Sequence, residues 1–173
     1  MKQVLQRMAE YNAKAGEAML AVIAKAPAGL QSKDVGVYFK SVDGIVEHMA
    51  WAIVLWLKRF AGFGTYPCLA SSVLVTRPLD ETKAAITGDS AKTAALLLEA
   101  SALLGRFIAE LPESELERRV KYRTTDGHEM ERTYWHTIFQ VLGHGTHHRG
   151  EVSAILDQNG VANDFNNFVT YMP

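Results

Sequence analysis

The chain has 173 residues, of which 48% are hydrophobic and 21% are charged, proportions that are ordinary for a soluble globular domain. The formal net charge of −1 provides no long-range field that would favour nucleic acid or an anionic membrane. The single cysteine, Cys68, excludes an internal disulfide and a cysteine-rich zinc module. We expect one domain spanning residues 1–173, because chains of this length usually form one hydrophobic core.

The N-terminal segment predicts neither export nor membrane insertion. MKQVLQRMAEYNAK carries charges throughout and has no apolar run, so we expect no secretory signal. The most apolar run in the chain, MAWAIVLWL, is about half as long as a membrane span. Together with the lone cysteine, these features predict a cytoplasmic protein that does not bind a membrane.

Two long helices are predicted in the first third of the chain. Apolar side chains recur at steps of three and four over residues 2–26, and Pro27 ends that pattern. A second helix is predicted over residues 39–60, with Ser41 as a candidate N-cap. Its charged residues share one narrow stripe, which predicts burial on several sides.

The third helix is predicted to begin near Asp89 or Ser90 and to end before Pro112. Residues 65–88, which precede it, contain prolines and a glycine at intervals. We expect that segment to be an irregular loop with at most one short helical turn.

The apolar pattern changes after the third helix. RRVKYRTTDGHEMERTY alternates weakly around Asp126-Gly127, which favours a small β-hairpin over a long loop. A fourth helix is predicted over residues 133–158, closed by Asn159-Gly160, and the aromatic residues of VANDFNNFVTYMP are expected to pack on the bundle. The predicted fold is therefore all-α: a four-helix bundle with a long connection between its second and third helices.

The stretch HGTHHRG contains the strongest candidate ligands. His144 and His148 are four residues apart, which places both on one face of a helix, where they could share one metal ion. Gly145 stands where a zinc-protease motif would have its glutamate, so that motif is absent. The spacing alone is a weak signal and fits a solvated helix face or a hydrogen-bonded polar pair better than a metal site. His48 lies among apolar neighbours in DGIVEHMAWAIVLW, so it must be either hydrogen-bonded in the core or bound to a metal.

Longer segments carry a family resemblance. SVDGIVEHMAWAIVLWLKRF and LGHGTHHRGEVSAILDQNG resemble the DinB/YfiT-like superfamily of metalloenzymes, and YNAK is similar to its first-helix motif. The resemblance spans about residues 5–160 and implies a four-helix bundle that is often a homodimer. In that family one histidine of the second helix and two of the fourth hold a metal. Matched by position, the implied ligands are His48, His144 and His148.

Three neutral imidazoles would leave the charge of a divalent cation largely uncompensated, with a fourth position open to water or substrate. Such a cation lowers the pKa of bound water to about 7, and it could also bind a thiol or polarise a carbonyl. Imidazole suits zinc, nickel, copper and iron. Zinc is our first expectation and nickel our second.

Three classes of function remain open. The first is a metal-dependent enzyme, because characterised relatives in the resembled family include transferases that use low-molecular-weight thiols and a thiol-dependent isomerase. Its expected partners are a small-molecule substrate and such a thiol; metal-assisted hydrolysis is weaker, since no general base is identified. The second is a non-catalytic metal-binding or small-ligand-binding protein of stress response. The third is a structural module whose histidines are core polar groups. The sequence assigns no catalytic residue.

Three residues beside the predicted ligands are candidates for supporting them. Glu151 follows His148 by three residues and His147 by four, so it either orients an imidazole N–H or forms an exposed pair with His147. His147 points about 100° away from its neighbours, and we expect a structural hydrogen bond there. Arg149 either binds an anion or, as we favour, holds its helix to a neighbouring segment.

Other polar and aromatic residues are expected to have packing or surface roles. Tyr11 and Asn12 could place polar groups near the pocket, with packing favoured for Tyr11. The histidines expected at the surface or in loops are His128 and His136. The tryptophans expected in the core or a dimer interface are Trp51 and Trp56. Cys68 is not expected to be catalytic, because no base lies beside it in the sequence.

Overall fold

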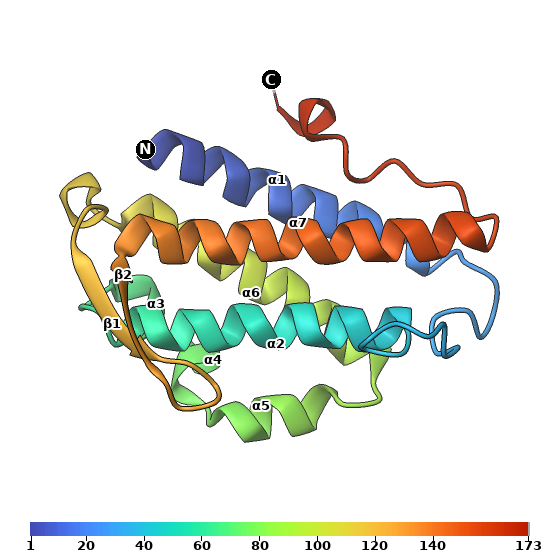
Figure 1. The fold of residues 1–173 in the computed structure, drawn as a ribbon, viewed down its shortest axis with the longest axis horizontal. Helices are drawn as coiled ribbons and strands as arrows, with labels where there is room; N and C mark the ends of the chain where they lie inside the picture. The colour runs from blue at the N-terminus through green and yellow to red at the C-terminus, as the bar shows by residue number, and fades with distance from the viewer. Residues whose placement is uncertain (173) are drawn as a thin grey trace.

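Four long helices run side by side in the computed structural model, which describes residues 1–172 (Figure 1). They are α1 (Lys2–Ile23), α2 (Val42–Ala61), α6 (Ser90–Glu110) and α7 (Tyr134–Gln158). The helices α1 and α2 each pack against both α6 and α7, so the four enclose one apolar core. The predicted all-α bundle is confirmed.

The helix ends follow from local capping chemistry. Ser41 caps α2 by accepting a hydrogen bond from the backbone N–H of Gly44, as predicted. Asp89 caps α6 by accepting a hydrogen bond from the N–H of Lys92. The helix α2 begins at Val42 rather than at the predicted residue 39, because Lys40 has a left-handed backbone (φ 67°) that cannot continue a helix.

The connection between α2 and α6 is more ordered than predicted. It contains α3 (Pro67–Ala70), α4 (Val73–Thr76) and α5 (Leu79–Ile86), so the expectation of at most one short turn was wrong. The prolines that we took as breakers instead precede or begin helices, where proline is favoured. Buried apolar side chains, one from each short helix, hold this segment on the bundle: Leu69, Leu74 and Ile86.

The predicted hairpin is also confirmed. After the short helix η1 (Glu113–Glu115), strands β1 (Arg119–Arg123) and β2 (Glu129–Thr133) pair antiparallel, with Tyr122 opposite Met130. The tight turn between them uses Gly127 at φ +89°, a conformation that glycine adopts without strain. Figure 1 shows the hairpin crossing one end of the bundle from α7 towards α5.

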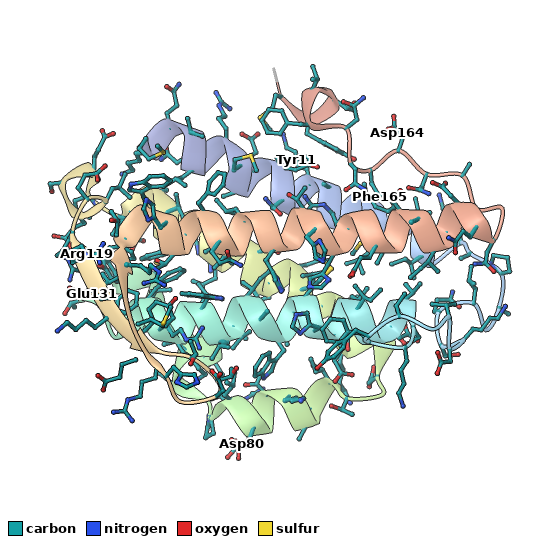
Figure 2. All side chains as sticks on the ribbon, in the orientation of Figure 1. Tyr11, Asp80, Arg119, Glu131, Asp164 and Phe165 are labelled. Atoms are coloured by element: carbon teal, nitrogen blue, oxygen red, sulfur yellow. The ribbon has the colours of Figure 1, made fainter. Side chains whose placement is uncertain are left out.

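The segment after α7 returns along α1, as expected. Phe165 is buried, and the ring of Phe168 meets that of Tyr11 at 5.0 Å between centroids. The Tyr11 hydroxyl donates a hydrogen bond of 2.9 Å to the backbone carbonyl of Asn166. Figure 2 shows Tyr11 on α1 below the last helical turn of the chain, η2 (Phe168–Tyr171). Among residues 1–172, no helix has both the length and the apolar character needed to span a membrane.

Gly44 allows the loop before α2 to fold back on the first turn of that helix. A side-chain carbon at this position would overlap the carbonyl oxygen of Phe39, a backbone atom that cannot rotate away. By contrast, a carbon added at Gly105, inside α6, would meet nothing within 4 Å.

We therefore predict that Gly44→Ala destabilises the metal-free protein by about 1–3 kcal/mol, because the loop must move to relieve the overlap. The control, Gly105→Ala, should instead stabilise it by about 0.5–1 kcal/mol, because alanine is the better helix former. Urea denaturation of both variants checks these opposite signs. A Gly44→Ala protein as stable as wild type would show that the loop does not need this contact.

Candidate metal centre

Three histidine side chains from two helices meet between α2 and α7. The Nε2 atom of His144 lies 3.0 Å from Nε2 of His48 and 3.0 Å from Nε2 of His148. His144 and His148 share one face of α7, and the packing of α2 on that face brings in His48. These three form a group whose nitrogen atoms are close enough to share one metal ion.

Hydrogen bonds alone do not satisfy this arrangement. The Nδ1–H of His148 donates to Glu151 Oε2 at 2.6 Å, so in the neutral ring its Nε2 carries a lone pair. The Nε2 of His144 has two ring nitrogens as neighbours, but it can donate one proton or accept at one lone pair. One cation at the centre would accept all three lone pairs. The donor set therefore fits a shared divalent metal ion.

Burial keeps two of these imidazoles neutral. Desolvation, followed by the nearby charge of His148, lowers the pKa of His48 and of His144 to about 4. Both rings are therefore unprotonated at neutral pH, which is the form that binds metals.

Glu151 contacts both His148 and His147, the two histidines that the sequence offered as its alternative partners. Its Oε2 lies 2.6 Å from Nδ1 of the buried His148, and its Oε1 lies 3.4 Å from Nε2 of the exposed His147. The shorter contact fixes the orientation of the His148 ring, as carboxylates beside metal-binding histidines do. The contact with His147 is the surface pair that helical spacing also predicted.

One side of the histidine group faces an open cleft of about 580 Å³ between α2, the hairpin and α7. His48 and His144 form part of its wall, and Trp51, Trp56 and Tyr122 supply aromatic surface. A cation held by the histidines would lie beside a space large enough for a small molecule.

Comparison with known proteins assigns the chain to a family. The family model described as DinB family matches residues 1–172. The chain belongs to the DinB family. It is also 22% identical over 167 residues to the "Protein DinB" of Bacillus subtilis (strain 168), a match that covers 96% of this chain and 92% of that protein. No solved structure matches it significantly.

In this DinB-family protein the histidine group has an aromatic cover that sequence reasoning missed. The Phe39 ring stacks on that of His48, with 4.1 Å between centroids and 20° between planes, and its edge meets His148 at 5.5 Å. We had placed Phe39 at the start of a helix. The left-handed Lys40 and the absent side chain of Gly44 turn it back over the site instead. Those two backbone features are what places Phe39 over the site, and the pattern of apolar residues in the sequence reveals neither of them.

Arg149 has the structural role that we favoured, and it explains the glycine after His144. Its guanidinium is buried, donates to Asn12 Oδ1 at 2.7 Å and to Thr146 Oγ1 at 3.1 Å, and lies 4.8 Å from the centre of the Tyr11 ring. This network ties α7 to α1. A side chain at Gly145 would come within 2.6 Å of Asn12 Oδ1, so the network leaves no room for a glutamate there.

The remaining predicted residues divide between the cleft and the surface. His136 is exposed, as expected, and it also lines the cleft. Trp51 and Trp56 are half-buried and line the cleft, and Trp56 also packs against the core, as one of the two expected placements has it. His128 is exposed beside the hairpin turn. Burial raises the pKa of the Cys68 thiol to about 11, which disfavours its thiolate form at neutral pH.

We predict that the tag-free protein binds about one divalent metal ion per chain and that His48→Ala abolishes this binding. Removing His48 leaves only the two ligands of α7. His128→Ala, at the exposed hairpin turn, is the matched control and should retain the full metal content. Elemental analysis after dialysis provides the measurement. Wild-type metal content in the His48→Ala protein would exclude the three-histidine site.

We also predict that Glu151→Gln weakens metal binding about 10–100-fold, because the neutral amide supports the His148 ring less strongly than a carboxylate does. The control is His147→Gln, which removes only the other partner of Glu151 and should change the affinity less than about twofold. Competition with a chromogenic chelator measures both affinities. Equal losses in the two variants would show that the glutamate does not act through His148.

Proposed function

We propose that this DinB-family chain is a divalent-metal-dependent enzyme that activates a low-molecular-weight thiol, as an S-transferase or a thiol-dependent isomerase. The observation that supports it best is the convergence of three imidazole nitrogens on the wall of an open cleft. A buried structural metal would need no such cleft, and a solvated histidine face would not converge.

In this proposal His48, His144 and His148 hold the cation, zinc being the first choice and nickel the second. When bound, the metal would supply positive charge that lowers the pKa of a thiol or water and polarises a carbonyl. Glu151 fixes the ring of His148, and Phe39 excludes water from the other side of His48. Substrate therefore approaches from the cleft.

The cleft favours thiol chemistry over hydrolysis. Its lining within the described chain contains no aspartate or glutamate, so hydrolysis would rely on water activated by the metal alone or on the cleft histidine His136. A thiol has a pKa near 8.5 in water and needs far less assistance to lose its proton. In the transferase reaction the sulfur forms a bond to an electrophilic carbon, the leaving group departs with its electron pair, and the thiol proton passes to solvent. In an isomerisation the thiolate sulfur bonds to one carbon of a conjugated double bond and its electrons move onto the conjugated carbonyl; the resulting single bond rotates, and the thiolate then leaves with its electron pair as the double bond re-forms.

The test is product formation from glutathione and other cysteine-derived thiols with electrophiles such as 1-chloro-2,4-dinitrobenzene and an unsaturated ketone. We expect the zinc-loaded wild type to exceed His48→Ala by at least about 100-fold, because loss of the metal removes several kcal/mol of charge stabilisation. The His128→Ala protein should match wild type. Equal turnover by wild type and His48→Ala would remove the metal from the mechanism. Full metal content without any product would favour a non-catalytic metal-binding or ligand-binding protein.

A further inference from the structure

The cleft beside the histidines has basic side chains but no acidic ones to balance them. Arg59 and Arg132 are the two arginines of its lining, which has no aspartate or glutamate within the described chain. The whole protein is nearly neutral, with 18 basic and 19 acidic residues, so this imbalance is local. A positive cleft attracts anionic molecules.

The two faces of the hairpin differ in how their arginines are paired. On the outer face, Arg123 lies 2.8 Å from Glu129, and Arg119 lies 3.9 Å from Glu131 (Figure 2). On the face towards the cleft, Arg132 donates only to a backbone carbonyl, at 2.8 Å, and makes no ion pair within residues 1–172. The sequence therefore neutralises the arginines that face away from the cleft and leaves the inner one available.

Arg59 is held in place without a counterion. Its guanidinium lies 4.6 Å from the ring centre of Trp56 and 5.2 Å from that of Tyr122, and it donates one hydrogen bond of 2.9 Å to the carbonyl of Arg123. It has no carboxylate partner in the described chain, and burial lowers its pKa from the ordinary value. A fixed, partly desolvated guanidinium with N–H donors to spare is suited to a carboxylate.

A third cation lies at the edge of the cleft. Lys83, on α5, has its ammonium group 5.6 Å from the ring centre of Trp51, which lines the cleft. It too makes no ion pair among residues 1–172. Basic groups from α2, β2 and α5 therefore surround the aromatic wall.

The positions of these groups indicate the size of the molecule. His48 and Arg59 are three helical turns apart on α2, roughly 16 Å between their Cα atoms. One ligand could contact both only if its reactive group and its anionic group lay at opposite ends. The cleft volume of about 580 Å³ is in the range that holds a molecule of that size.

From these contacts we infer that the cleft binds an elongated organic anion, with its carboxylate or comparable acidic group at Arg59, in the positive field to which Arg132 also contributes, and its flat or apolar part against Trp51 and Trp56. The inference rests on the proposed function, because it takes the cleft to be where the substrate meets the metal. Arg59 acts here as a substrate-binding residue and takes no part in the bond changes.

The experiment uses naphthalene-2-sulfonate, an aromatic anion that coordinates metals poorly, and the neutral naphthalene-2-methanol as probes. Each is titrated calorimetrically into the zinc-loaded protein. We expect the sulfonate to bind wild type about tenfold more tightly than the alcohol, and we expect Arg59→Gln to remove that preference, because the glutamine amide lacks the positive charge that would favour the sulfonate over the alcohol. The binding of the alcohol should weaken less than that of the sulfonate in that variant, because the alcohol carries no charge.

Lys121→Gln is the matched control, because it removes one positive charge from the outer face of the same hairpin. The substitution should alter sulfonate binding less than about twofold, because the charge of an exposed side chain outside the cleft is largely screened by solvent and salt. Arg132→Gln, at an exposed position, should weaken the sulfonate about threefold and serves as the test if Arg59→Gln does not fold.

Equal affinity of wild type for the two probes, no measurable binding of the sulfonate, or equal losses in Arg59→Gln and Lys121→Gln would each overturn the inference. Because neither probe is a thiol or an electrophile, its result is separate from that of the turnover assay. Anion preference without thiol turnover would leave this inference standing and contradict the proposed reaction. Thiol turnover without anion preference would support the proposed reaction and overturn this inference.

Discussion

The packing of α2 against α7 is the constraint on which the rest of the site depends. It brings the nitrogen of His48 to 3.0 Å from that of His144, across ninety-six positions of sequence. Hydrogen bonding can satisfy only one of the two contacts at His144 Nε2, because one ring nitrogen either donates one proton or accepts at one lone pair. The bundle core stabilises the approach through apolar burial on both helices, and the site uses helix positions that the core leaves at its edge.

Neighbouring residues of α7 have two different roles: one set forms the histidine group, and the other holds α7 against α1. His148 faces the other two histidines of the group and is held by Glu151, whereas Arg149, one position later, faces α1 and ties the helices together through Asn12. A helix turns about 100° per residue, so adjacent positions serve different neighbours. The glycine after His144 serves the second role, since it makes room for the contact between Asn12 and Arg149. The positions of His144 and His148 therefore depend on the hydrogen bond between Arg149 and Asn12, which joins α7 to α1, as well as on their spacing in the helix.

The elements outside the four helices determine access to the site. The loop before α2 places Phe39 over His48, and the hairpin closes the end of the cleft through the contact of Tyr122 with Trp56, at 5.2 Å between ring centroids. Neither element contributes to the main interhelical packing. Because both lie beside the histidines, they decide which side of a bound cation is open and what chemical character the open side has.

The sequence by itself determined the four helices, the hairpin and the spacing of His144 and His148, because helical period, capping residues and an Asp-Gly turn are local properties. The sequence did not determine the short helices between α2 and α6, because their prolines suggested breaks in helical structure. The tertiary structure shows that these helices form where Leu69 and Leu74 are buried against the bundle. The candidate ligand His48 was reached through a family resemblance, since no local pattern links it to α7. The position of Phe39, the cleft and the stacking of Arg59 between Trp56 and Tyr122 were decided only by tertiary structure. Each depends on contacts between segments far apart in the chain, and such contacts leave no periodic signal in the sequence.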